Sequence, residues 1–109
     1  MMGTTVTRAY GALSMGRWAV TNRNQLIDGE WTVLRSEAGD LSLCFEPRHG
    51  GQSIEIARRD IESMTVRERS FINYITEVSV RPSAGGATLT IVAPRGRTKK
   101  MLLSLGFPD

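Results

Sequence analysis

The chain has 109 residues, of which 40% are hydrophobic and 23% are charged, and this composition excludes a disordered tail or a fibrous protein. No apolar run approaches the roughly 20 residues of a membrane-spanning helix, and residues 1–17 lack the continuous apolar core of a secretory signal. The formal charge of +3 is mild for a protein that binds nucleic acid. A single cysteine, Cys44, excludes an internal disulfide. These features predict one soluble, cytoplasmic globular domain.

The first sixteen residues are rich in glycine, threonine, serine and alanine. We expect residues 1–16 to form a flexible N-terminal arm, and residues 17–109 to form a single domain. The first predicted strand spans 17–27, although a polar run at 22–25 interrupts it. The pair Asp28-Gly29 then predicts a two-residue hairpin turn, because both central positions of a type I′ turn need positive φ.

From residue 31 onward, short stretches of apolar and polar residues alternate, and turn signals interrupt them roughly every 8 to 12 residues. This pattern is typical of an all-β sandwich or barrel and predicts six further strands, over 31–36, 41–46, 52–58, 63–69, 74–81 and 87–93. Glycine pairs or Gly-Asp predict corners at 39–40, 50–51 and 85–86. The apolar faces predict a core that includes Leu43, Ile54, Ile56, Val80, Leu89 and Ile91.

The last segment has a helical pattern. Thr98 can cap a helix that begins at Lys99, and an apolar stripe of Met101, Leu102 and Leu105 follows. Gly106 can close this helix in the left-handed conformation. The alternative is an eighth strand, because Leu103 is also apolar and the segment is short.

Three segments, together with the order of seven strands and one terminal helix, resemble pleckstrin-homology-like (PH-like) domains, including the GRAM type. They are AVTNRNQLI at 19–27, IEIARRDIESM at 54–64 and TKKMLLSL at 98–105. The resemblance implies a mainly β fold, a seven-stranded, partly open barrel or sandwich with one short C-terminal helix. The terminal helix is shorter than in that family, and residues 28–53 separate the first segment from the second.

The residues that usually carry catalysis are isolated. His49, the single histidine, lies in a Pro-Arg-His-Gly-Gly loop that we expect to be exposed, and nothing near Cys44 in the sequence would activate its thiol. The acidic residues are dispersed, and no glycine-rich phosphate loop precedes a helix. We therefore predict no enzyme, no catalytic residue, no metal site and no cofactor.

Five arginines form the main candidate binding site. If strands 52–58 and 63–69 are neighbours, their guanidinium groups come close together, and Arg67 and Arg69 share one solvent-exposed face. Such a cluster can hold a lipid phosphate, a nucleic-acid backbone or an acidic protein. The alternative is a solvated strand face balanced by nearby acidic residues. The cluster consists of Arg58, Arg59, Arg67 and Arg69, with Arg48 joining from the preceding loop.

Aromatic side chains in the connection after this strand form a second candidate. Phe71 and Tyr74 either make an apolar contact surface on the loop or fold back over the mouth of the barrel, and we favour the second interpretation.

These features favour a non-enzymatic binding or adaptor module. We expect a protein partner or self-association, with an anionic lipid head group or a nucleic acid as further ligands of the arginine cluster. One alternative function is a structural subunit of a larger assembly such as a virion, tail or filament, in which the N-terminal arm reaches a neighbour. Another is a nucleic-acid accessory protein.

Overall fold

Seven antiparallel strands and one C-terminal helix make up the structure, a computed structural model that describes residues 3–18 and 25–108. The strands are β1 (Thr4–Met15), β2 (Ile27–Arg35), β3 (Leu41–Pro47), β4 (Ile54–Ala57), β5 (Ile61–Arg69), β6 (Asn73–Val80) and β7 (Thr88–Pro94). The helix is α1 (Arg95–Leu105), and two short 3-10 turns lie at Arg58–Asp60 and Pro82–Ala84. The predicted fold class, mainly β with seven strands and a terminal helix, is confirmed.

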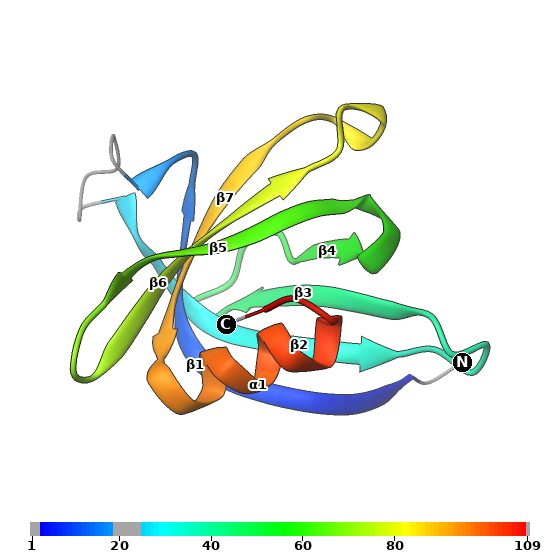
Figure 1. Ribbon diagram of the computed structural model, residues 1–109, viewed down its shortest axis with the longest axis horizontal. Helices are drawn as coiled ribbons and strands as arrows, with labels where there is room; N and C mark the ends of the chain where they lie inside the picture. The colour runs from blue at the N-terminus through cyan, green and yellow to red at the C-terminus, as the bar shows by residue number, and fades with distance from the viewer. Residues whose placement is uncertain (1–2, 19–24, 109) are drawn as a thin grey trace.

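Hydrogen bonds join the strands in the order β4-β3-β2-β1-β7-β6-β5, and the sheet curls into a half-barrel (Figure 1). The edge strands are therefore β4 and β5. Helix α1 lies across one end of the half-barrel and packs on β1, β2, β6 and β7. The sheet thus buries one face against itself and the helix, as a strongly curled antiparallel sheet does.

Strand β1 lies at the centre of the sheet, between β2 and β7. The expectation of a flexible arm is therefore wrong for residues 4–15. The small side chains that predict an arm are needed for packing: Ala9 is buried, and a Cβ atom at Gly11 would lie 2.1 Å from the carbonyl oxygen of Val92. Neighbouring backbones approach too closely at this position for larger side chains.

The strand predicted over 17–27 falls largely on residues 19–24, which lie outside the described residues. The flanking residues 16–18 and 25–26 are not in a strand, and β2 begins at Ile27. The predicted Asp28-Gly29 turn is wrong, because both residues lie within β2. A Cβ atom at Gly29 would lie 2.2 Å from the carbonyl oxygen of Glu46, so the close approach of β3 requires glycine here.

The other six predicted strands agree with β2 to β7, with differences of a few residues at their ends. The glycine corners are also confirmed, since glycines in all three connections have positive φ: Gly39, Gly50, Gly51, Gly85 and Gly86.

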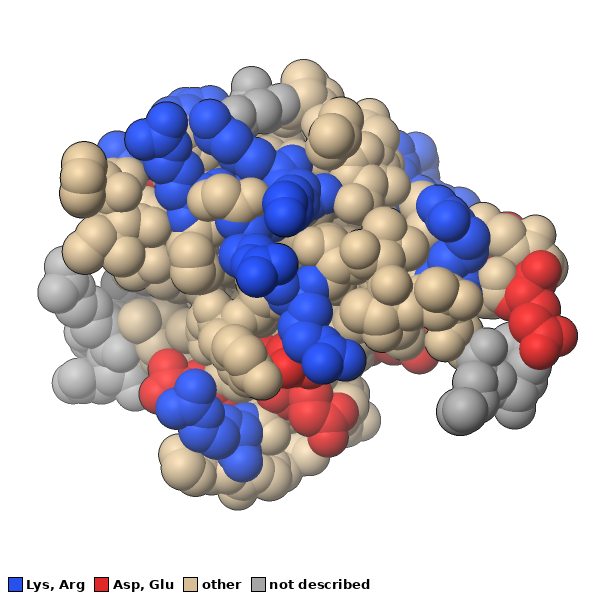
Figure 2. All heavy atoms as spheres, turned by 90° about the horizontal axis from the view of Figure 1, so that it is seen from below, with Lys and Arg blue, Asp and Glu red and all other residues tan. Residues whose placement is uncertain are grey.

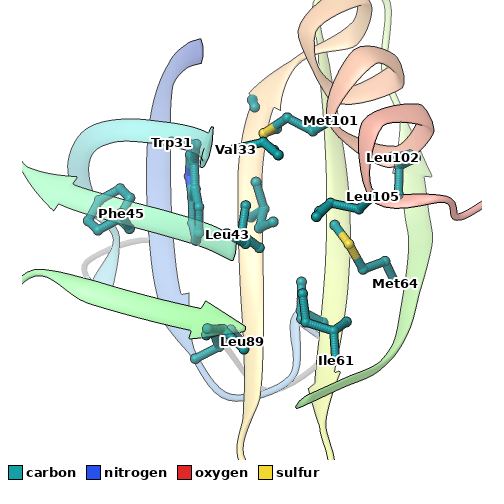
Figure 3. Close-up of a cluster of buried hydrophobic side chains, with 14 of the residues drawn as sticks. Trp31, Val33, Leu43, Phe45, Ile61, Met64, Leu89, Met101, Leu102 and Leu105 are labelled. Atoms are coloured by element: carbon teal, nitrogen blue, oxygen red, sulfur yellow. The ribbon is translucent and has the colours of Figure 1, made fainter. Parts of the chain in front are cut away.

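The core lies between the two halves of the sheet and α1, whose Met101, Leu102 and Leu105 point into it (Figure 3). Trp31 is fully buried, and its indole nitrogen donates a hydrogen bond of 3.0 Å to the carbonyl of Ala12. Five of the six predicted core residues are buried, namely Leu43, Ile56, Val80, Leu89 and Ile91. The sixth, Ile54 on edge strand β4, is half-buried and packs against the same core.

The helix begins at Arg95, four residues earlier than predicted. Pro94 has no amide hydrogen with which to continue the ladder of β7, and the chain turns into the helix there. Thr98 is buried inside the helix and donates its hydroxyl to the carbonyl of Ala93 instead of capping the N-terminus. Gly106 closes the helix with φ of +80°, as predicted, and the alternative of an eighth strand is wrong.

Candidate interaction surface

The expectation that strands 52–58 and 63–69 pair with each other is wrong, because β4 and β5 are the two opposite edges of the sheet. Arg58 and Arg59 lie just before β5, whereas Arg67 and Arg69 lie at its far end. At about 3.3 Å per residue, a strand of this length separates the two pairs by roughly 25 Å. The five arginines therefore do not form one cluster, and a binding role for each stays a prediction.

Arg58 is engaged in the fold. Its Nε donates a hydrogen bond to the carbonyl of Leu105, the last residue of α1, and its Nη1 donates another, of 3.3 Å, to the carbonyl of Ile61. Its guanidinium group also lies 4.0 Å from the centre of the Phe107 ring. Together these contacts hold the C-terminal end of α1 against the start of β5.

Arg67 neutralises a buried charge. Its Nε lies 2.8 Å from Oε1 of Glu77, which is 7% exposed, and the amide of Trp18 donates a 2.8 Å hydrogen bond to Oε2. Burial alone would raise the pKa of Glu77, but these hydrogen bonds and the charges of Arg67 and Arg17 hold the pKa below its ordinary value. A bulge between Val66 and Glu68 interrupts the alternation that would place Arg67 and Arg69 on one face.

Of the remaining predicted residues, the structure brings together only Arg69 and Tyr74. Arg69 stands 5.6 Å from the ring centre of Tyr74. Tyr74 is 5% exposed and belongs to β6, so the interpretation of an apolar contact surface is wrong for Tyr74. Arg48, in the loop after β3, and Arg59 are both exposed.

Phe71 and its neighbour form the tip of the β5–β6 hairpin. Phe71 is 93% exposed and Ile72 is 70% exposed, so the favoured interpretation that the rings fold back over the barrel is wrong for Phe71. The alternative, an apolar contact surface at Phe71, stays a prediction. The turn is held closed by Ser70, whose hydroxyl donates to the carbonyl of Asn73 and accepts from its amide. The carbonyl of Ile72 accepts a 3.0 Å hydrogen bond from the amide of Arg95, which fixes the tip to the start of α1.

The outer side of α1 is basic and was missed in the sequence. The helix contains four basic residues and no acidic residue. Its inner side is the buried stripe, and Arg97, Lys100 and Leu103 lie exposed on the outer side, where Leu103 is 80% exposed. The predicted helix start at Lys99 leaves Arg95 and Arg97 outside the helix. Four of the six residues at 95–100 are basic, and this density of charge alone could have indicated a basic surface.

Figure 2 views the molecule from below, the side on which Figure 1 draws α1, and shows Lys and Arg side chains gathered in a band, with Asp and Glu side chains at its lower end. We call the combined surface of the hairpin tip and the outer side of α1 the α1–hairpin face. Its residues are Phe71, Ile72, Arg95, Arg97, Lys99, Lys100 and Leu103.

The chemistry-bearing residues remain apart from this face. Cys44 on β3 is half-buried, and burial, with a smaller effect from the charge of Glu55, raises the pKa of its thiol to about 11. A thiol with this pKa is protonated near neutral pH and is a poor nucleophile. His49 is exposed in the loop after β3. Across residues 3–18 and 25–108, no group of three or more His, Cys, Asp or Glu side chains is placed to hold a metal ion.

No protein-family model and no curated protein matches the sequence. Among solved structures, the chain is similar to the pleckstrin homology (PH) domain of USP37, with a TM-score of 0.70 and 16% identity over 94% of this chain and 92% of that one. The chain has a PH-like fold. It is also similar to the C-terminal domain of an unknown protein from Leishmania infantum, with a TM-score of 0.67 and 14% identity over 94% and 84% of the two chains.

The α1–hairpin face occupies one end of the PH-like half-barrel. Asn73 pairs with Pro94 at one end of β6, next to the hairpin tip and the start of α1, whereas Ser79 pairs with Thr88 at the other end. The connection at 81–87 therefore lies at the end of β6 opposite the α1–hairpin face. Among the described residues, no helix is long and apolar enough to cross a membrane.

Proposed function

We propose that this chain is a non-catalytic binding module that contacts an anionic partner through the α1–hairpin face. The observation that carries the proposal is the composition of this face. A helix without acidic residues supplies four basic side chains and the exposed Leu103, and the hairpin tip supplies the exposed Phe71 and Ile72. A PH-like fold is typically that of a binding module, which agrees with this use of the surface.

The exposed hydrophobic residues are concentrated here. The described part of the chain has six large hydrophobic side chains that are exposed, and three of them, Phe71, Ile72 and Leu103, belong to the α1–hairpin face. Scattered single residues of this kind are normal on a protein surface, whereas several on one face mark a contact surface. Basic groups beside them select an anionic partner and accelerate its approach.

The anionic partner in this proposal can be an acidic protein, as an adaptor role would require. The structural-subunit alternative rests on an arm that reaches a neighbouring molecule, and residues 4–15 of that arm are hydrogen-bonded into the centre of the sheet. This alternative therefore lacks the segment on which it depends.

Heparin–agarose, a polyanionic matrix, tests the proposal. The double variant Arg97→Gln and Lys100→Gln removes two exposed charges from the face, and we expect it to elute at a clearly lower salt concentration than the wild type. The matched control is Arg35→Gln with Arg81→Gln, which removes the same net charge from exposed positions outside the face. Equal shifts for both variants would show that only net charge matters and would contradict the proposal.

A further inference from the structure

We propose that the anionic partner of the α1–hairpin face is a second copy of this chain, whose apolar cleft at the open end of the half-barrel receives the hairpin tip. The inference rests on the proposed function, because it names the partner of the same face. The self-association expected from the sequence then involves two defined surfaces.

The open-end cleft lies at the end of the half-barrel opposite the α1–hairpin face. Its volume is about 270 Å³, which is close to the lower limit of pockets that hold small molecules, so it suits one or two inserted side chains. Its lining is mainly apolar and comes from four strands and the connection at 81–87, with Met15, Ile54, Val80, Leu89 and Ala87 among its residues. Val80 and Leu89 are buried, whereas Met15 is 56% exposed and offers an apolar contact at the rim.

The hairpin tip has the complementary shape. Phe71 and Ile72, with 93% and 70% of their surfaces exposed, protrude from the end of the β5–β6 hairpin. The Ser70 hydroxyl bonds to both backbone groups of Asn73, and the carbonyl of Ile72 accepts from the amide of Arg95, so the turn is already fixed. An aromatic side chain inserted into an apolar pocket is typical of the centre of a protein interface. A tip that is fixed beforehand loses little conformational freedom on binding.

The charges at the cleft oppose those beside the tip. Glu55 and Asp60 belong to the lining of the cleft, and no basic side chain of the described residues does. The arginines closest to this lining in sequence are Arg59 and Arg81, and Arg81 donates a hydrogen bond to the carbonyl of Arg59. Arg95 begins α1 beside the tip. Opposite charges therefore meet when the tip enters the cleft, and they favour this orientation of the two molecules.

The placement of the two surfaces favours a head-to-tail contact. They lie at opposite ends of the half-barrel and share no residue. A contact between two α1–hairpin faces would instead bring the four basic side chains of one helix against those of the other, which is unfavourable. Head-to-tail contacts extend into open chains or rings instead of closing into a two-fold dimer. A contact centred on two side chains is small, so we expect weak association.

Sedimentation equilibrium of the full chain tests the proposal. At about 0.1 M salt, we expect the average mass to rise with concentration beyond twice that of the 12.0 kDa chain, and to fall as salt approaches about 1 M. Phe71→Ser with Ile72→Ser changes only exposed side chains, so the fold should persist and association should weaken by about tenfold or more. The control Tyr10→Ser removes another exposed side chain, on β1, and should associate like the wild type.

The cleft is tested with an added charge. Ala87→Arg places a positive charge in the lining of the cleft, and the matched control Ser83→Arg adds the same charge at an exposed position of the same connection outside this lining. Only Ala87→Arg should weaken association, again by about tenfold or more.

A mixture of two weakened variants identifies the geometry of the contact. Ala87→Arg keeps an intact tip, and the Phe71 and Ile72 double variant keeps an intact cleft. Mixing them should restore association, but only as far as a dimer, because one intact pair of surfaces is present. A contact made by the same surface of both copies would not be restored in this way.

Three results would overturn the inference. They are a wild type that keeps the mass of a single chain up to about 1 mM at low salt, equal weakening by Ala87→Arg and Ser83→Arg, or a mixture of the two weakened variants that stays monomeric. If the wild type stays monomeric but its retention on heparin still depends on Arg97 and Lys100, the second copy is not the partner and the proposed function stands. If its retention is also independent of these two residues, the proposed function fails as well.

Discussion

Glu77 is a carboxylate on β6 that is 7% exposed and still carries its charge, because Arg67 and the amide of Trp18 both donate to it. Removing one partner of such a pair leaves a buried charge without compensation. Arg67 is itself half exposed, so water replaces part of the lost interaction.

We therefore predict that Arg67→Gln lowers the free energy of unfolding by about 1–3 kcal/mol. Arg35→Gln, at an exposed position, should change it by less than about 0.5 kcal/mol. Urea denaturation of both variants measures the difference. The sequence predicts that Arg67 faces solvent, and equal stability of these two variants would restore that interpretation.

The lowered pKa of Glu77 has a consequence for acid stability. A carboxyl group whose pKa is lower in the folded state contributes stability that is present above its unfolded pKa, near the ordinary value of 4.5, and is lost as pH falls through the folded pKa. We expect the wild type to lose stability below about pH 4.5, and Glu77→Gln to lose less over the same range. Parallel stability curves for the two proteins would show that Glu77 does not contribute.

At the scale of elements, β1 depends on close backbone contacts. A Cβ atom at Gly11 would lie 2.1 Å from the carbonyl oxygen of Val92 on β7, whereas a Cβ atom at Gly96, in α1, would meet nothing within 4 Å. The same substitution should therefore have opposite effects at the two positions. Gly11→Ala forces strands apart, and Gly96→Ala improves helix propensity.

We predict that Gly11→Ala lowers the free energy of unfolding by at least about 2 kcal/mol, as overpacking does. Gly96→Ala should raise it by about 0.5–1 kcal/mol. Thermal or urea unfolding measures both. If Gly11→Ala were as stable as the wild type, β1 would not lie where the structure places it.

The elements differ in how far the sequence predicts them. Strands β2 to β7 have an alternating apolar pattern that local reasoning detects. Strand β1 lacks this pattern. Its small residues are needed because β2 and β7 pack closely on both sides of it, and these neighbours are known only once the strand order is known. The start of α1 was misplaced because Thr98 is a good cap by type, whereas Pro94 ends β7 and begins the helix without a side-chain cap.

At the scale of the whole molecule, the candidate site depends on strand order. An arginine cluster requires β4 and β5 to pair, and the curled sheet instead places them at opposite edges. Phe71 was found from the sequence because an aromatic residue in a connection is conspicuous. The basic side of α1 cannot be recognised from the sequence without the true start of the helix, which includes Arg95 and Arg97. The structure also shows that the apolar stripe of the helix faces inward, so the basic residues lie on the outer side.

The most direct test of the α1–hairpin face is a set of amide spectra of the ¹⁵N-labelled chain, recorded during titration with a short heparin oligosaccharide. Signals of residues in contact with the oligosaccharide shift or broaden, so these changes map the contact surface residue by residue. We predict that the changes appear first at residues 70–72 and 95–103 and are lost as salt rises. Changes concentrated in the connections at 48–53 and 81–87, with residues 95–103 unchanged, would contradict the account.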